Sequence, residues 1–240
     1  PYAYAEASDI ISEAKLEELT KIADPNLDWG TRFQDYRISL YVSGGDETKR
    51  QEAIKKLRGM TGKDRVVDGD KTALGILVQE LKDRGETISC AESCTGGLAA
   101  SNLTSLPGSS SYMMGSVTSY FLSVKEKVLG VKKETLENHG AVSEECALEM
   151  AEGVRRVISS DWAFSITGVA GPDKSEGKEV GTVCLGFSGK DRESVAVTIH
   201  LFSFGRESIR RRSTAAAFIL MNAFMKGEDI KEIVRGWTAF

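Results

Sequence analysis

The pattern of apolar and polar positions changes along the chain and divides it into three stretches. In the first, apolar residues recur at helical spacing over residues 10–19, alternate with polar residues over 36–42, and recur at helical spacing again over 48–57. These periods predict a helix, a strand and an amphipathic helix, with a turn at residues 43–46. We therefore expect a small α+β domain over residues 1–72.

In the second stretch, residues 73–226, predicted strands and helices interleave. Strands are expected over 87–91, 113–120, 163–166, 181–185 and 194–201, and helices over 74–85, 96–107, 123–129, 143–159 and 206–225. This order favours a three-layer α/β/α body. Two late strands follow each other without a helix between them, which indicates a mixed, mostly parallel sheet.

Side chains at the helix starts and the chain end refine this picture. Ser123 and Glu126 have the spacing of a capping box, and Ser143 is a good N-cap for the helix that follows it. The third stretch, residues 227–240, is charged and is predicted to be a tail, either frayed or docked on the body.

Composition limits the kinds of partner. The 240 residues carry 31 Lys+Arg against 35 Asp+Glu, a net charge of -4, which gives no electrostatic reason to bind nucleic acid or an anionic membrane. There is neither a run of 18 apolar residues nor a basic-then-apolar start, so no membrane span or signal peptide is predicted. The chain begins at Pro1, and we expect it to be a piece of a longer protein.

Four cysteines without a Cys-x-x-Cys pair, and two histidines, predict neither a disulfide scaffold nor a zinc site. Reduced thiols in a cytoplasmic protein are the expectation.

The most informative segment is AESCTGG, residues 91–97, which lies between a predicted strand and a predicted helix. Open α/β sheets bind ligands at this end of a strand. Glycines allow backbone to approach a ligand closely, and a helix start directs N–H groups and the positive end of its dipole at one point. Such a turn can hold a phosphate or stabilise an oxyanion, although a purely structural cap has the same pattern.

A nucleophile in this turn needs a base. Ser93 is the first candidate, with Lys125 as its base, because Lys125 lies early in the helix after the next predicted strand, where the dipole would lower its pKa. Tyr120 could relay the proton or orient the lysine. Two alternatives remain open here: Lys125 as a solvated surface lysine, and Cys94 as a thiol nucleophile whose pKa the helix start would lower.

Two further segments could contact a ligand. Residues 166–172 form a second Gly-rich turn after a strand, followed by a charged loop, 173–178, suited to covering a pocket. A P-loop is excluded because Gly171 and Gly177 are one residue too far apart and Glu179 replaces the magnesium-binding Ser or Thr. Arg206 and Arg210 share a helix face, which is typical either of a phosphate site or of a solvated surface.

Seven segments between Leu74 and Met225 match, in order and spacing, the C-terminal domain of the CinA family, the nicotinamide-nucleotide amidases. They are residues 91–97, 107–110, Tyr120 with Lys125, 129–131, 139–145, 167–172 and 180–183. Residues 30–72 resemble the KH-like linker domain that precedes the amidase in longer members. KH-type nucleic-acid binding is not expected, because no Gly-x-x-Gly clamp between two helices is predicted.

The resemblance implies hydrolysis of nicotinamide mononucleotide to nicotinate mononucleotide and ammonia, without metal or cofactor, by a cytoplasmic homodimer in pyridine-nucleotide salvage. It implies Ser93 as nucleophile, Lys125 as base and Tyr120 as an assisting hydroxyl. The residues expected to bind the substrate are Cys94, Thr95, Gly96, Gly97, Thr167, Gly168, Ala170, Gly171, Arg206 and Arg210.

This chain departs from the family pattern beside the expected pocket. Phe121 and Leu122 replace a usual Ser-Asn pair, Asp173-Lys174-Ser175 replaces a Gly-rich stretch, and Glu179 replaces a proline. A catalytically weak or inactive nucleotide-binding member is therefore the alternative.

Overall fold

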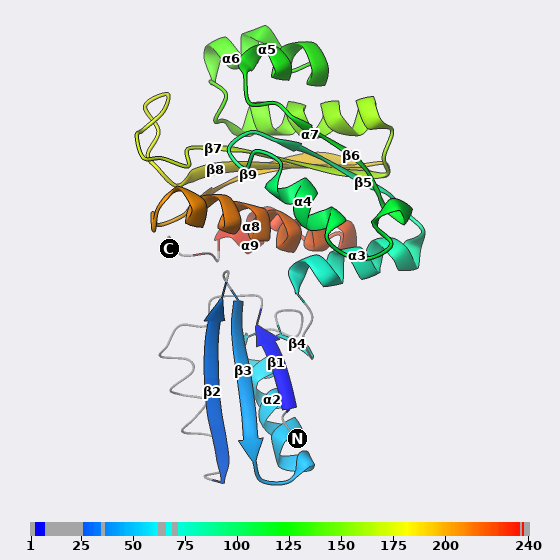
Figure 1. The fold of residues 1–240 in the computed structure, drawn as a ribbon, viewed down its shortest axis with the longest axis vertical. Coiled ribbons are helices and arrows are strands. Elements are labelled where there is room, and N and C mark those ends of the chain that lie inside the picture. The colour runs from blue at the N-terminus through cyan, green and yellow to red at the C-terminus, as the bar shows by residue number, and fades with distance from the viewer. Residues whose placement is uncertain are drawn as a thin grey trace. The chain divides into compact units, whose positions relative to one another are not determined.

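The computed structural model describes residues 3–7, 26–34, 37–61, 66–68, 72–235 and 237. The chain divides into two compact units, Pro1–Gly75 and Ile76–Phe240, each with its own sheet (Figure 1). The helix predicted over residues 10–19 lies outside the described residues.

The first unit contains a four-stranded antiparallel sheet in the order β2-β3-β1-β4. Its elements are β1 (Ala3–Ala7), β2 (Leu27–Gln34), β3 (Arg37–Gly44), α2 (Glu47–Thr61) and β4 (Val66–Asp68). The strand and the amphipathic helix predicted from the periodicity are thus present. Arg50, which is 6% exposed, donates from Nη1 to the carbonyls of Gly44 and Gly45 at 2.8 and 2.9 Å and so ties α2 to the turn before it.

One detail of the sequence analysis needs correction. A Gly-x-x-Gly sequence does occur, from Gly59 to Gly62. Gly59 lies near the end of α2, Gly62 lies outside the described residues, and the next described element is the strand β4.

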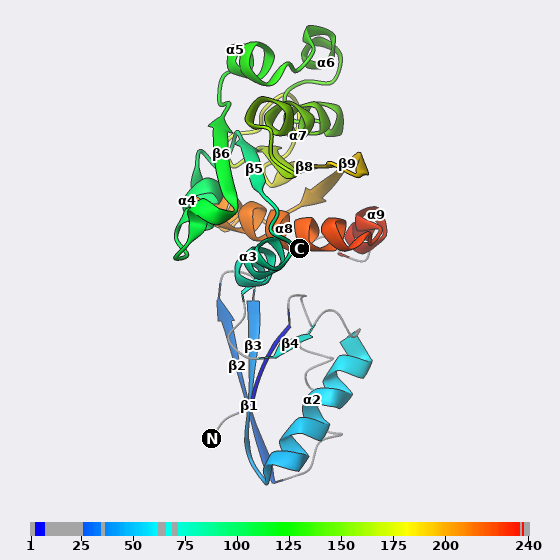
Figure 2. The same ribbon diagram turned by 90° about the vertical axis from the view of Figure 1, so that its right-hand side faces the viewer.

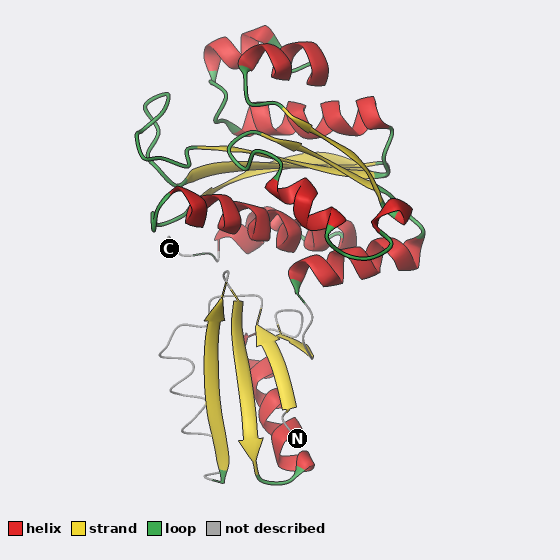
Figure 3. Ribbon diagram, viewed as in Figure 1, coloured by secondary structure: helices red, strands yellow, loops and turns green. Residues whose placement is uncertain are grey.

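The second unit is built on a mixed five-stranded sheet in the order β6-β5-β7-β8-β9 (Figure 3). The strands are β5 (Ile88–Glu92), β6 (Met113–Thr118), β7 (Trp162–Gly168), β8 (Thr182–Gly189) and β9 (Arg192–His200). β5 pairs in parallel with β6 and β7, whereas β8 runs antiparallel to β7 and β9. The α/β class and the mixed sheet are confirmed.

Helices cover both faces of this sheet, as Figures 1 and 2 show. One face carries α7 (Glu144–Ile158), with α5 (Leu122–Val124) and α6 (Lys133–Asn138) beyond it. The other face carries α3 (Ala73–Arg84), α4 (Leu98–Thr104), α8 (Arg206–Lys226) and α9 (Ile230–Arg235). The three-layer arrangement expected from the sequence is therefore present, and it leaves the carboxyl end of β5 between its two neighbouring strands.

Two of the predicted caps and ends have different outcomes. Ser143 caps α7 as predicted, since its hydroxyl accepts the N–H of Cys146 at 3.1 Å. The capping box at Ser123 is wrong: α5 begins after Phe121, without a side-chain cap, and continues into a π-helical turn, Lys125–Leu129. Because the helix already begins at Leu122, Ser123 lies inside it and not at the N-cap position.

The segment after Gly227 is not a frayed tail as far as Arg235. It forms α9, and Ile230 is buried there. Ile230 is buried and Ile233 and Val234 are partly buried, so packing on the body supports a helix too short to be stable alone.

The helix α7 packs closely against β8. A Cβ at Gly186 would lie 2.2 Å from the carbonyl oxygen of Ala147 in α7 and 2.7 Å from Ser165 Oγ in β7. Ser165 Oγ itself donates to the Ala147 carbonyl at 2.5 Å. The helix therefore approaches the sheet to a distance that only glycine permits.

We predict that Gly186→Ala lowers the free energy of unfolding by about 2–3 kcal/mol, because the added methyl group overlaps a main-chain oxygen that cannot rotate away. Urea denaturation measures this loss. Val157→Ala, on the exposed side of α7, is the control and should change the free energy by about 0.5 kcal/mol or less. Equal effects of the two substitutions would contradict the close-packing account.

Candidate functional site

Ser93 directly follows β5, at the carboxyl end of the strand. Its N–H donates to the carbonyl of Ile166 in β7 at 2.9 Å, and its own carbonyl accepts the N–H of Gly96 at 3.1 Å. The serine is partly exposed, whereas the residues on either side, Glu92 and Cys94, are buried. Main-chain hydrogen bonds to β7 and within the turn thus fix the position of Ser93, whose side chain is partly exposed.

Lys125 lies beside Ser93, although 32 residues separate them in the chain. Its Nζ is 3.0 Å from Ser93 Oγ and also donates to the carbonyl of Ser119. The side chain is fully buried, so the surface-lysine interpretation is wrong. Burial lowers the pKa of Lys125 because the charged ammonium loses its hydration. The expected direction is therefore correct, but desolvation causes it, not a helix dipole.

The ends of β5 and β6 are joined directly. The N–H of Ser119, which is buried after β6, donates to the carbonyl of Glu92 at 2.8 Å. Ser119 therefore bonds to β5 through its N–H and to Lys125 through its carbonyl. This pair of bonds sets the distance between the lysine and Ser93.

The sequence analysis missed Glu92. Its carboxylate is buried and accepts the N–H groups of Gly97, Ala99 and Ala100 at 3.0, 3.0 and 2.9 Å. These are the amides at the start of α4 that the analysis had expected to bind a phosphate or an oxyanion. A signal was present, because an acidic residue at the end of a strand and shortly before a helix start complements the helix dipole.

Cys94 differs from its predicted alternative role. Its side chain is buried, and this burial raises the pKa of the thiol to about 12. The expectation that the helix start would lower that pKa is wrong for two reasons. The thiol is buried, and the carboxylate of Glu92 already accepts the N–H groups at the helix start.

The other predicted binding residues gather around this turn. Arg210 Nη2 donates to the Thr95 carbonyl at 2.7 Å, and Arg206 Nη1 donates to the Gly171 carbonyl at 2.8 Å. Gly96 and Gly97 both have positive φ, as does Gly171. The two arginines therefore connect the turn after Ser93 with the Gly-rich turn after β7.

Tyr120 is placed at the edge of this cluster. Its hydroxyl accepts from Arg206 Nη2 at 3.1 Å, and the side chain is 60% exposed. The next residue, Phe121, is 75% exposed. In this structure the tyrosine hydroxyl is bonded to the arginine, and no hydrogen bond joins it to Ser93 or Lys125 among the described residues.

The Gly-rich turn after β7 is also tied to α7. Thr167 Oγ1 donates to the carbonyl of Ala141 at 2.7 Å. In the charged loop, Glu176 accepts the N–H groups of Ala141 and Val142, both at 3.1 Å, and Lys178 donates to the carbonyls of His139 and Val142. The loop is thus fastened to the turn before α7. Gly168 and Ala170 lie between these contacts in sequence.

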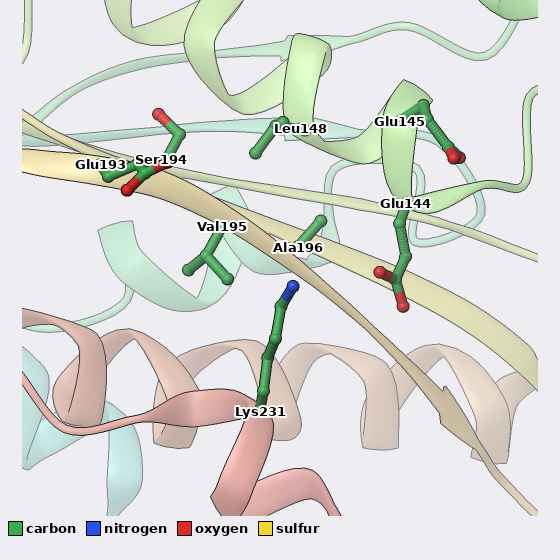
Figure 4. Close-up of a pocket in the computed structure, with 8 residues that line it drawn as sticks. All are labelled: Glu144, Glu145, Leu148, Glu193, Ser194, Val195, Ala196 and Lys231. Carbon is green, nitrogen blue, oxygen red and sulfur yellow. The ribbon is translucent and has the colours of Figure 1, made fainter.

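A separate groove lies along β9, at the far edge of the sheet (Figure 4). It is lined by residues of α7, β9 and α9: Glu144, Glu145, Leu148, Glu193, Ser194, Val195, Ala196 and Lys231. None of the predicted site residues lines it. We place the candidate site at Ser93, because there the hydroxyl and the buried amine of Lys125 meet at hydrogen-bond distance.

The described residues offer neither a metal site nor a membrane-spanning helix. They contain no cluster of three or more His, Cys, Asp or Glu side chains arranged to hold a metal ion. None of the helices in the same residues has the length and apolar character needed to cross a membrane.

Comparison with known proteins gives a consistent result. Residues 70–225 match the model of the CinA C-terminal domain. A relative from Bacillus pumilus is 44% identical over 207 residues, which cover 84% of this chain and 49% of the relative. A CinA-like protein from Endomicrobium trichonymphae is 39% identical over 227 residues, covering 88% of this chain and 52% of that protein. This chain therefore spans about half the length of the curated relatives it matches.

The fold agrees with this match. The crystal structure of a competence/damage inducible protein from Agrobacterium tumefaciens superposes with a TM-score of 0.61 at 34% identity, covering 64% of this chain and 93% of that one. A CinA superfamily protein from Klebsiella pneumoniae gives a TM-score of 0.62 at 28% identity, with 65% and 96% covered. The chain belongs to the CinA family.

Proposed function

We propose that this protein is an amidohydrolase that uses Ser93 as nucleophile and Lys125 as base. The observation that carries the proposal is the 3.0 Å separation of Lys125 Nζ and Ser93 Oγ at the end of a central strand. A lysine acts as a base only when it is neutral, and burial favours the neutral amine. The Ser119 carbonyl accepts one N–H of that amine, which leaves its lone pair for the serine proton.

The reaction follows from these positions. Lys125 takes the proton of Ser93 as Oγ attacks the carboxamide carbon, and the resulting ammonium gives that proton to the amide nitrogen, which leaves as ammonia when the C–N bond breaks. Water then hydrolyses the acyl-enzyme, with Lys125 again as base, to give the carboxylate. The N–H groups of Cys94 and Thr95 directly follow the nucleophile, and Glu92 binds only later amides. We therefore propose that the N–H groups of Cys94 and Thr95 stabilise the oxyanion.

The choice of substrate rests on the resemblance of residues 91–97, 120–125 and 167–172 to the amidases of the family. It points to the carboxamide of nicotinamide mononucleotide, in pyridine-nucleotide salvage. Arg206 and Arg210 are cations near the turn. Each donates to a main-chain carbonyl, and Arg210 also forms an ion pair with Glu207 at 2.8 Å. A guanidinium binds a phosphate more strongly than it binds a neutral carbonyl. The cytoplasmic location, the homodimer and the assisting role of Tyr120 are part of the same proposal.

A second candidate function is nucleotide binding without turnover. It is favoured by the bond between the Tyr120 hydroxyl and Arg206, which directs the hydroxyl away from the expected catalytic role. Phe121 and Leu122, both exposed beside it, add apolar surface where the family usually has polar side chains. Saturable binding of nicotinamide mononucleotide without ammonia release would support this candidate.

Ser93→Ala should reduce ammonia release from nicotinamide mononucleotide by about 10³-fold or more, because it removes the attacking oxygen. Cys94→Ala should leave the rate within about threefold of the wild type, since a thiol that stays protonated is not a nucleophile. A coupled ammonia assay on the purified proteins measures both rates. Full activity in Ser93→Ala, or its loss in Cys94→Ala alone, would contradict the serine mechanism.

Lys125 also makes folding depend on pH in a predictable direction. Its folded pKa lies below the ordinary value of 10.5, so between the two values the unfolded chain holds a proton that the folded chain lacks. Stability then rises with pH across this window, and the cost of burying Lys125 is greatest below its folded pKa.

The matched variant is Lys125→Met, which keeps the length of the side chain without the amine. We expect it to be more stable than the wild type near neutral pH, and the difference to shrink as the pH approaches 10.5. Urea denaturation at a series of pH values measures this. Lys127→Met, at an exposed site, should show a difference that does not change with pH. The same flat profile for Lys125→Met would refute a lowered pKa.

A further inference from the structure

Glu92 is a buried carboxylate that no step of the proposed reaction uses. It is 0% exposed, and no lysine or arginine among the described residues forms an ion pair with it. Its partners are three main-chain N–H groups, to Gly97, Ala99 and Ala100, together with the weak donor Cys90 Sγ at 3.7 Å. A carboxylate is stabilised in such a place by the N–H groups and dipole of a helix start.

The same residue contacts the segment that carries the base. Its main-chain carbonyl accepts the N–H of Ser119 at 2.8 Å, and the carbonyl of Ser119 accepts from Lys125. Glu92 precedes Ser93 in the chain, so its side chain orders the turn after the nucleophile while its main chain orders the approach of the lysine.

The Glu92 side chain restrains a turn that contains two consecutive glycines. Gly96 has φ 59° and Gly97 has φ 97°. Gly97 is also the N-cap residue of α4, so the helix has no capping side chain at that position. Two consecutive glycines with positive φ have more freedom in an unrestrained chain than any other pair. The three hydrogen bonds to the Glu92 carboxylate hold Gly97, Ala99 and Ala100 in place. They therefore limit where Ser93 Oγ and the amides of Cys94 and Thr95 can lie.

We propose that Glu92 is the positioning residue of the site: a built-in anion that occupies the start of α4, fixes the turn of residues 93–97, and excludes the negative group of a substrate from those amides. A substrate phosphate must then be bound elsewhere around the turn. The effect on turnover rests on the amidase function proposed above, whereas the occupation of the amides does not.

The first test removes the carboxylate and returns it in solution. Glu92→Ala leaves three N–H groups vacant, and acetate should fill them. We expect sodium acetate to raise the Tm of Glu92→Ala by about 2–4 °C over sodium chloride at the same ionic strength, and to leave the wild-type Tm unchanged. If Glu92→Ala is unfolded in chloride, acetate-dependent folding followed by circular dichroism is the same measurement. An equal response to the two salts would overturn the proposal for the amides.

The second test keeps the shape and removes the charge. Glu92→Gln retains one carbonyl oxygen but turns an amide NH₂ toward a main-chain N–H. With its fold verified by circular dichroism, we expect kcat to fall about 10- to 100-fold while KM stays within about threefold, because the nucleophile is displaced and substrate binding is not. Acetate should restore part of the activity of Glu92→Ala. A wild-type kcat in Glu92→Gln would overturn the positioning role.

Glu149→Ala is the matched control. Glu149 also accepts a main-chain N–H, that of Lys132 at 2.8 Å, but it lies in α7 away from the turn. We expect it to lower Tm and leave kcat unchanged. If the wild-type protein releases no ammonia, the amidase proposal fails, and the acetate comparison still decides whether Glu92 occupies the amides.

Discussion

The burial of a lysine beside a serine is the constraint on which the arrangement of this unit depends. Burial disfavours the ammonium form of Lys125, and the carbonyl of Ser119 accepts a hydrogen bond from its amine. Everything that keeps water from this amine therefore also keeps it in its basic form. The elements around Lys125 therefore matter because they keep it buried.

The main element around Lys125 is α7. It packs against the sheet on one side and against the π turn that begins at Lys125 on the other. A Cβ at Gly153 of α7 would lie 2.0 Å from the carbonyl oxygen of Leu129, the last residue of the π turn that begins at Lys125. Arg156 donates to the same carbonyl at 2.9 Å. Gly186 gives the equivalent close approach on the sheet side. Two glycines and one arginine thus set the depth of the lysine, although none of them lies at the site.

The sequence predicted the order of strands and helices well because each element has a clear apolar period and a clear start. It also offered Ser93 and Lys125 as partners, because each follows a predicted strand. The residues alone left a surface lysine open, and the resemblance to the CinA family favoured the pair. It could not predict that Lys125 is buried, because a lysine flanked by Glu126 and Lys127 has the local pattern of a surface helix. The depth of that side chain is decided by α7, which begins 19 residues later.

The choice between two adjacent nucleophiles shows how environment overrides intrinsic reactivity. In water the Cys94 thiol would ionise far more readily than the Ser93 hydroxyl, and a helix start would favour it further. Here the thiol points into the core, where its pKa rises to about 12, and the carboxylate of Glu92 meets the helix start instead. Ser93 keeps access to solvent and to the lysine. The turn that exposes one residue must bury the next, so the same few backbone angles that bring the hydroxyl to the amine also remove the thiol from competition.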